Sequence, residues 1–589
     1  MLAPILALAL AAPAPDLRTT AEKTGFERTG RAAETRALCR AYEQAFPGRA
    51  RCFTFGETPE GRPMVALAAS ADGVLDPAAA RARKRAVVLF HGAIHAGELD
   101  GKDAGFIELR RWLQSRDGGP LAKVTAVFVP IFNVDGHERF GPNQRPNQRG
   151  PAEGGWRVTS QNLNLNRDYT KADAPETRAM LALLDAWDPI VYADLHVTDG
   201  AQFQHDVAIL VEPRLGWTPS LRPVGQALSD ALLAALTAKG HLPIDFYPSF
   251  VDERDPASGF ELGVAPPRFS QSYWAVRNRI GILYEAHSWR TYKERVATCV
   301  DFLDALLAQA AKRGASWREA VVRADREAAA LGGKPVVLEW EKGTRRTSFA
   351  FRGYAYTRET SVVTGTPVPR YDETRPETFS VPVVEDPKPK LIVTLPKGGW
   401  IVPASLARRL EERLRLHGIR YEWLHEARPA AEVEAYRAAT VDFAAVPFDG
   451  RQRLTVTGAW RPEKRDVAAG ALWVPVAQTA AVLAASLLEP EAPDSFLAWG
   501  EMNAHFVRVE WVEPYVLEAW ARDQMARNPD LRAEFEKAFP PGSPTPAGAP
   551  ATAPVTDGTD PRLEWFARRH PSWDASWRLY PVLRAAKRP

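Results

Sequence analysis

Between residues 85 and 312 the sequence alternates short apolar runs with longer stretches of helical periodicity, and this order constrains the fold more than any other feature. Runs typical of buried strands lie at 86–91, 124–132, 190–196, 207–211 and 280–287. Helix-like stretches lie at 98–114, 175–186, 219–239 and 290–312. Strands that alternate with helices form a layered structure in which helices cover a largely parallel sheet. We therefore predict an α/β fold with a mixed, mostly parallel sheet flanked by helices.

The composition and the strand and helix pattern change in the rest of the chain, which predicts further domains. We expect a first domain over residues 15–315, a strand-rich region over 335–384 and a C-terminal α+β region over 390–589. The strand-rich region is followed by a proline- and charge-rich linker. A chain of 589 residues is long enough for several such units.

Two patterns stand out inside the C-terminal region. A strand at 390–395, a helix at 403–417 and a strand at 418–424 resemble a small β-α-β unit. Residues 540–560 are rich in proline, alanine and glycine, and we predict a flexible low-complexity segment there.

Charge is nearly balanced, with 75 lysines and arginines against 72 acidic residues. No long basic stripe interleaved with aromatic residues occurs, so the electrostatic footprint of a nucleic-acid-binding protein is missing. We expect no nucleic-acid partner.

The first fourteen residues, MLAPILALALAAPA, form an apolar stretch that ends in the small-residue pattern Ala12-Pro13-Ala14. Such a segment is typical of a secretory signal peptide, although its positively charged start is missing and a hydrophobic N-terminal helix is the alternative. It is too short to span a bilayer, so we expect no stable membrane anchor after its removal and a secreted or periplasmic location.

Three cysteines are present. Cys39 and Cys52 are close enough in sequence to pair in an oxidising compartment. Cys299 lies in an apolar helical pattern, which favours a buried, inert thiol.

Histidines and acidic residues follow the predicted strands at three places. His95 and Glu98 come directly after the first strand, His196 ends the third, and Glu285 lies near the end of the fifth. Imidazole and carboxylate groups are ligands that zinc accepts, and a catalytic zinc site needs three protein ligands and an open position. His-x-x-Glu alone is a weak signal, because the same residues can simply begin a helix. The carboxyl ends of sheet strands, however, are where such folds gather their catalytic groups.

Five motifs, in this order, resemble those of the carboxypeptidase A-like zinc metallopeptidases. They are GAIHAGELDGKDAG at 92–105, IFNVDG at 131–136, NLNLNRDY at 162–169, ADLH at 193–196 and LYEAHS at 283–288. The resemblance covers about residues 20–315 and is nearest to a bacterial branch that carries an additional C-terminal region. It implies that residues 15–315 form a zinc carboxypeptidase-like catalytic domain.

The resemblance also implies a metal centre. His95, Glu98 and His196 would bind one zinc ion per chain, and Glu285 would act as general base and then as general acid. The family usually has an aspartate behind the first histidine ligand. This chain has Asn164 there, which accepts a hydrogen bond but carries no charge.

The substrate-binding residues follow from the same motifs. Asn166 and Arg167 would bind the terminal carboxylate of the substrate. Arg157 would polarise the scissile carbonyl, and Arg149 is the alternative at a longer spacing. The family's mobile tyrosine has no clear counterpart, and Tyr273 is the nearest residue of that type.

The expected activity is hydrolysis of the C-terminal peptide bond of a peptide or peptide-like substrate that has a free carboxylate. One alternative keeps the zinc chemistry and changes the substrate to a cell-wall peptide or an N-acyl amino acid. A second is a catalytically inactive binding protein of the same fold.

Overall fold

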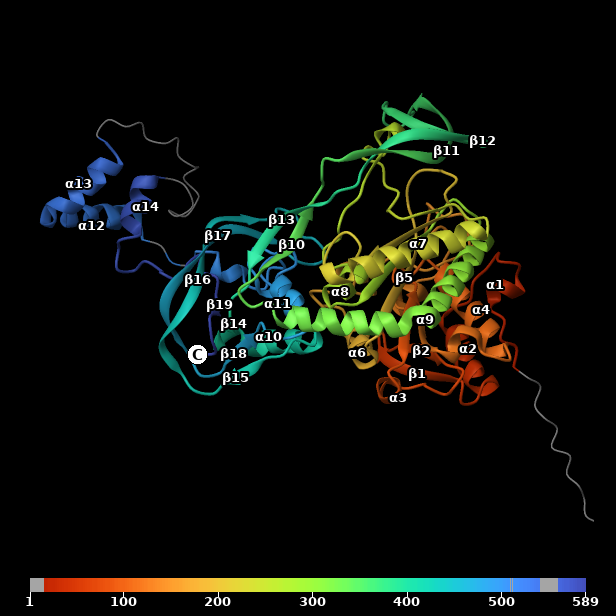
Figure 1. Ribbon diagram of the computed structural model, residues 1–589. Coiled ribbons are helices and arrows are strands. Elements are labelled where there is room, and N and C mark those ends of the chain that lie inside the picture. Colours follow the sequence, from red (N-terminus) through yellow and green to blue (C-terminus); the bar gives the residue numbers. More distant parts are fainter. Residues whose placement is uncertain (1–14, 509, 511, 541–559) are drawn as a thin grey trace, which may run out of the picture.

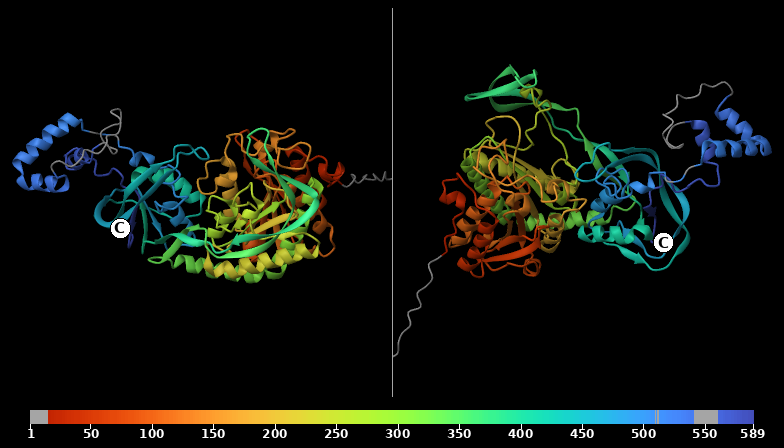
Figure 2. Two further views of the ribbon diagram at one scale, coloured as in Figure 1. Left: turned by 90° about the horizontal axis from the view of Figure 1, so that it is seen from above. Right: turned by 180° about the vertical axis from the view of Figure 1, so that it is seen from behind.

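The computed structural model describes residues 15–508, 510, 512–540 and 560–589. The chain forms two main bodies side by side, with a small helical group beyond the second (Figure 1). The long helix α9 (Tyr292–Ala329) runs from the first body to the second, and Figure 2 shows the same arrangement from two other sides. The predicted signal segment 1–14 lies outside the described residues, as does most of the low-complexity segment 540–560.

The first body is built on an eight-stranded sheet with the order β1-β2-β4-β3-β5-β9-β6-β7. Its four central strands, β4, β3, β5 and β9, are parallel. The pairs β1–β2, β2–β4 and β6–β9 are antiparallel, and the edge pair β6–β7 is parallel. The strands are β1 (Ala50–Glu57), β2 (Pro63–Ala69), β3 (Ala86–Gly92), β4 (Val124–Val129), β5 (Val191–Val197), β6 (Val207–Glu212), β7 (Pro243–Ile244) and β9 (Ile280–Ala286). The central strands are buried along their whole length, which is why they read as unbroken apolar runs.

Helices flank this sheet, which confirms the predicted fold class. They are α1 (Thr20–Lys23), α2 (Ala32–Ala45), α3 (Pro77–Ala82), α4 (Asp100–Gln114), α5 (Val134–Glu138), α6 (Pro175–Trp187), α7 (Arg222–Ala238) and α8 (Ser270–Val276), with α9. Helix α6 begins with a first-turn proline, as its sequence predicts. A capping box between Thr291 and Glu294 begins α9. The helix continues well past the predicted end at 312 because its second half is also apolar on one face, where Ala320, Val321 and Ala324 pack with Leu221.

The strand-rich region forms a long hairpin of β11 (Arg346–Thr360) and β12 (Pro367–Val384). This hairpin stands over the first body (Figure 1) and pairs with the short strand β8 (Phe260–Glu261). Phe351 and Val381 of the hairpin pack with Phe260 in a separate apolar cluster. A two-stranded ribbon of β10 (Pro335–Glu341) and β13 (Lys388–Thr394) leads into and out of the hairpin.

The second body contains a six-stranded sheet with the order β15-β18-β14-β19-β16-β17. Its strands are β14 (Gly399–Val402), β15 (Glu422–Leu424), β16 (Arg428–Phe443), β17 (Leu454–Val467), β18 (Ala471–Pro475) and β19 (Leu583–Ala585). The helices beside and beyond it are α10 (Ala404–Leu416), α11 (Ala481–Leu488), α12 (Pro514–Arg527), α13 (Pro529–Ala538) and α14 (Pro561–Ala567).

The predicted β-α-β unit of this region needs a correction. The run 390–395 belongs to β13, which pairs with β10 outside the six-stranded sheet. The strand that precedes α10 within the sheet is β14, and β18 lies between β14 and β15. The sequence pattern identified the helix and the second strand, but the apolar run at 390–395 finds its partner in a strand far away in sequence.

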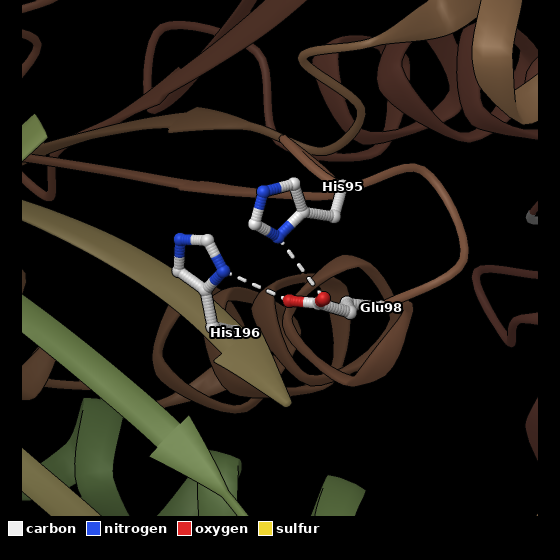
Figure 3. Close-up of side chains that lie close together, drawn as sticks. All are labelled: His95, Glu98 and His196. Atoms are coloured by element: carbon white, nitrogen blue, oxygen red, sulfur yellow. Dashed lines mark hydrogen bonds and ion pairs between the residues drawn. The ribbon is translucent and has the colours of Figure 1, made fainter. Parts of the chain in front are cut away.

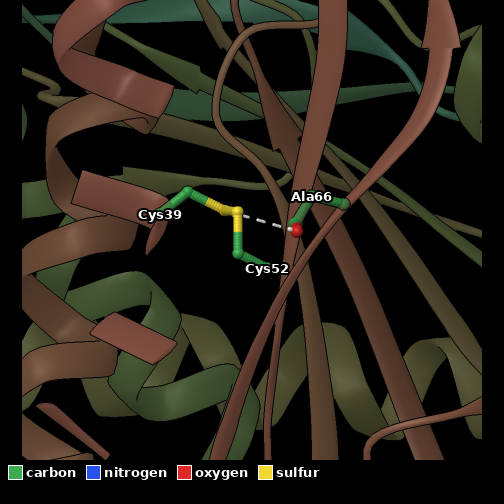
Figure 4. The surroundings of a disulfide bond; sticks show 3 residues. All are labelled: Cys39, Cys52 and Ala66. Carbon is green, nitrogen blue, oxygen red and sulfur yellow. Dashed lines mark hydrogen bonds between the residues drawn. A yellow bond between two sulfur atoms is a disulfide. The ribbon is translucent and has the colours of Figure 1, made fainter. Parts of the chain in front are cut away.

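Cys39 of α2 and Cys52 of β1 form a disulfide, with their Cα atoms 5.4 Å apart (Figure 4). Cys299 is free and buried in α9. In the described part of the chain, every helix is too short or too polar to traverse a bilayer.

Candidate active site

The parallel strands bring the predicted metal ligands to one edge of the large sheet. His196 lies near the end of β5 and pairs in register with Glu285 on β9. His95 and Glu98 lie in the connection between β3 and α4, which starts at the same edge. Residues that are far apart in sequence therefore meet because parallel strands end together.

His95, Glu98 and His196 form a compact, buried group (Figure 3). The Nδ1 atom of His95 lies 3.0 Å from Oε1 of Glu98, and Nδ1 of His196 lies 2.8 Å from Oε2 of the same carboxylate. One ligand atom from each residue lies within 4.8 Å of the other two. Two imidazoles and one carboxylate at this spacing fit a single zinc ion that keeps an open position.

The Nε2 atoms of the two histidines contact polar side chains outside the metal group, so that both Nδ1 atoms face Glu98. Asp194 Oδ2 lies 2.8 Å from Nε2 of His196, and Asn164 Oδ1 lies 3.2 Å from Nε2 of His95. Burial lowers the pKa of His95 to about 4, which keeps this imidazole neutral and able to bind a metal. His196 lies between the carboxylates of Glu98 and Asp194, which face its two ring nitrogens.

Glu285 lies beside the metal group and is not part of it. Its side chain is buried, and among the described residues its Oε2 atom has no hydrogen-bond partner. Burial raises the pKa of Glu285 to about 8, and the charges of Glu98 and Asp194 act in the same direction. A carboxylate with a free oxygen next to a metal group is placed for proton transfer.

The metal group opens into a cavity of about 450 Å³. Asn166, Arg167, Arg157 and Glu285 line it together with the two histidines. Arg157 Nη1 lies 3.6 Å from Oε1 of Glu98. The positive charge of Arg157 therefore lies where the metal group meets the cavity, the side from which a substrate carbonyl oxygen would approach.

Arg167 is the second cation of the cavity. Its guanidinium donates a hydrogen bond to the backbone oxygen of Asn166 at 2.8 Å and lies 4.1 Å above the ring of Phe269. In the described part of the chain it forms no ion pair with a carboxylate. Burial, with the nearby charge of Arg157, lowers the pKa of Arg167 to about 10, so it stays charged at neutral pH. The charge of Asp449 acts on the pKa of Arg167 in the opposite direction. A partly buried cation that is not held in a salt bridge offers a site for an anion.

Comparison with known proteins agrees with this geometry. Residues 35–209 match the model of the zinc carboxypeptidase family. This segment belongs to the zinc carboxypeptidases. The chain thus contains the domain of a zinc enzyme, and the His95, Glu98 and His196 group is where one metal ion can be held.

Solved carboxypeptidase structures resemble the chain in part. A metallo-carboxypeptidase from Burkholderia cenocepacia is 17% identical, with 47% of this chain and 68% of that chain covered and a TM-score of 0.34. Carboxypeptidase A from Helicoverpa armigera is 16% identical, with 51% and 74% covered and a TM-score of 0.32. No curated protein matches the chain.

Two of the predicted substrate-binding residues lie away from the cavity. Arg149 does not line the cavity, because its Nη1 donates to Glu373 of β12 at 2.8 Å. Tyr273 is fully buried on α8, and its hydroxyl lies 3.0 Å from Nδ1 of His417. The structure therefore corrects both predictions: Arg149 contacts the hairpin, and Tyr273 contacts the C-terminal body.

The sequence analysis missed two residues of the site. Tyr247, in the loop after β7, lines the cavity and is 39% exposed. Desolvation of its hydroxyl by the surrounding protein, with the charge of Glu285, raises the pKa of this group. Arg145 Nη2 lies 2.8 Å from Oε1 of Glu98, and its side chain packs against Gly97, where a Cβ atom would be only 2.4 Å from Cγ of Arg145. Neither residue has a motif around it, and only the glycine of His-Ala-Gly-Glu gives a sequence signal for close packing.

Proposed function

We propose that the chain is a metallocarboxypeptidase that removes the C-terminal residue of peptides with a free carboxylate. The observation that carries this proposal is a shared cavity: it holds the metal group, the free oxygen of Glu285 and the unpaired guanidinium of Arg167. A terminal carboxylate is a substrate group that a half-buried guanidinium outside any salt bridge binds well.

The proposed reaction assigns one task to each residue. A zinc ion held by His95, Glu98 and His196 would lower the pKa of a bound water and polarise the carbonyl. Glu285 accepts a proton from the attacking water as its oxygen bonds to the carbonyl carbon, and then delivers that proton to the amine nitrogen when the C–N bond breaks. Arg157 donates hydrogen bonds to the carbonyl oxygen as negative charge develops on it. Asn166 and Arg167 hold the carboxylate end, so that only the last peptide bond reaches Glu285.

Product analysis tests this assignment. The purified protein, loaded with zinc, is incubated with one peptide in two forms, with a free and with an amidated C-terminus, and the products are identified by mass spectrometry. We expect stepwise loss of single residues from the free end, little cleavage of the amide form, and no cleavage after a chelator removes the metal. Internal cleavage of both forms would replace the proposal by an endopeptidase or cell-wall amidase. Absence of cleavage of any form would favour an inactive binding protein.

We further propose a secreted or periplasmic location. The Cys39–Cys52 disulfide supports it, because such bonds persist in oxidising compartments. N-terminal sequencing of protein recovered from the periplasm or the medium should give a start near residue 15. Full-length protein in the cytoplasm with reduced cysteines would contradict the proposal.

A further inference from the structure

The second body, which contains the six-stranded sheet, contacts the loop that directly follows Arg167. This loop, residues 168–173, begins at the buried Asp168, which accepts hydrogen bonds from the backbone nitrogens of Asp173 at 3.1 Å and Ala174 at 2.9 Å. Lys171 Nζ lies 2.6 Å from the same carboxylate. The loop is therefore a closed turn, and any shift of it moves the short turn Leu165–Arg167 to which it is joined.

The middle of the loop is held by two aromatic residues of the second body. Nε2 of His417 lies 3.0 Å from the backbone oxygen of Thr170, and Nε1 of Trp499 donates to the Thr170 hydroxyl at 3.2 Å. Thr170 and His417 are both fully buried. These contacts are consequently part of a packed interface between the two bodies.

The end of the loop is held by two arginines. Arg413 of α10 donates to the backbone oxygens of Lys171 and Ala172 and, at 2.9 Å, to Oδ1 of Asp173. Arg451, in the connection between β16 and β17, donates to both oxygens of Asp173, at 2.9 and 2.6 Å. Although burial acts in the opposite direction, the hydrogen bond from Arg451 and the nearby cations hold the pKa of Asp173 below its usual value.

The opposite wall of the Arg167 site is fixed in the same way. Phe269, on which the Arg167 guanidinium lies, follows Arg268. The backbone nitrogen of Arg268 donates to Oδ2 of the buried Asp494 at 2.8 Å, and its guanidinium lies 3.3 Å from Oδ1. The second body therefore holds both the chain that carries Arg167 and the ring beneath its guanidinium.

We infer that the second body is a working part of the peptidase: Arg451, Arg413 and Asp494 are positioning residues that set the place of Arg167 for the substrate carboxylate. A carboxylate-binding guanidinium must be held to within a fraction of an ångström, and such precision needs supporting contacts behind the residue that binds. The inference rests on the proposed function, because it takes Arg167 as the group that binds the substrate carboxylate.

Arg451→Gln is the variant that tests the inference with the least damage to the fold. Arg413 and Lys171 remain beside Asp173. Arg409 remains beside Glu501, the other carboxylate that Arg451 contacts. No buried carboxylate is therefore left without a cation. With the full-length zinc enzyme we expect KM for a free-carboxylate peptide to rise about tenfold while kcat changes less than about twofold, because only binding and placement are weakened. Calorimetry with a non-hydrolysable peptide analogue should show the same loss of affinity, zinc content should stay at the parent value, and Arg451→Lys should recover part of the loss.

Arg437→Gln is the matched control. Arg437 lies on β16 and forms a similar two-contact ion pair with Glu463 of β17, at 3.0 and 3.3 Å, away from the 168–173 loop. We expect its KM to equal that of the parent. An unchanged KM in Arg451→Gln, or an equal rise in Arg437→Gln, would overturn the inference.

A second variant covers the case in which Arg451→Gln does not fold. Asp494→Asn loosens the Phe269 wall and is judged by the same criterion, a raised KM with kcat and zinc content preserved. Failure of the inference stays distinct from failure of the proposed function. If the parent enzyme distinguishes free from amidated peptides and the variants keep its KM, only the inference is wrong. If the parent does not distinguish them, the proposed function is wrong.

Discussion

The two bodies both bury carboxylates, but they treat them differently. In the second body Glu489 accepts hydrogen bonds from Nε1 of Trp400 at 2.7 Å and from Nε of Arg584 at 3.0 Å. In the first body Glu285 is about as deeply buried, yet its Oε2 has no partner among the described residues and the side chain faces a cavity. A buried carboxyl group whose hydrogen-bond partners are complete is satisfied within the fold, whereas one that lacks a partner beside a cavity is available for chemistry.

The largest predicted effect is on kcat, which should depend on Glu285 and not on Glu489. Glu285→Gln should lower kcat by about a hundred- to ten-thousand-fold, because a positioned acid-base group contributes that much. Zinc content, measured by elemental analysis, should stay at one per chain. His196→Ala is the control and should lose most of its zinc. Loss of zinc from Glu285→Gln would show that Glu285 is a ligand and that the metal group is wrong.

The second prediction concerns Glu489, which should matter for stability and not for activity. Arg584→Met removes the cation beside Glu489 and should lower the free energy of unfolding of the second body by about 3 to 5 kcal/mol, because an uncompensated charge is left in the interior. Thermal unfolding measures this change. Well below the unfolding temperature, kcat should equal that of the parent. A large loss of kcat in the folded variant would mean that the two carboxylates are not functionally different.

The smallest effect is expected at Arg149, whose ion pair with Glu373 is solvent-exposed. Arg149→Ala should change stability by no more than about 1 kcal/mol, as is usual for exposed pairs. Its kcat/KM should match the parent value, whereas Arg157→Ala should lose activity. A comparable loss in both variants would restore Arg149 to the site.

The sheet could be predicted from local patterns, whereas the metal group could be predicted because its residues lie in motifs that resemble those of a known family. Buried parallel strands read as apolar runs, and His196 and Glu285 stand at the ends of two of them. The placement of Arg149 could not be predicted, since its partner Glu373 lies 224 residues away in sequence.

The positions of Tyr247, on a loop, and Tyr273, at an interface, could not be predicted from the sequence either. Tyr273 lies nearer to Glu285 in sequence, but its place is decided by His417 of the second body. Tyr247 reaches the cavity from a loop without regular periodicity. Which tyrosine faces a cavity depends on contacts between distant segments, and local sequence does not encode those contacts.

The most direct test of the account compares kcat/KM for one peptide with a free and with an amidated C-terminus, in the parent enzyme and in Arg167→Ala. Removing one partner of a buried, hydrogen-bonded charge pair costs about 2 to 5 kcal/mol. We predict that the parent strongly prefers the free carboxylate and that Arg167→Ala loses this preference by a corresponding factor, with little change toward the amide. Equal cleavage of both peptides by the parent, or an undiminished preference in Arg167→Ala, would contradict the account.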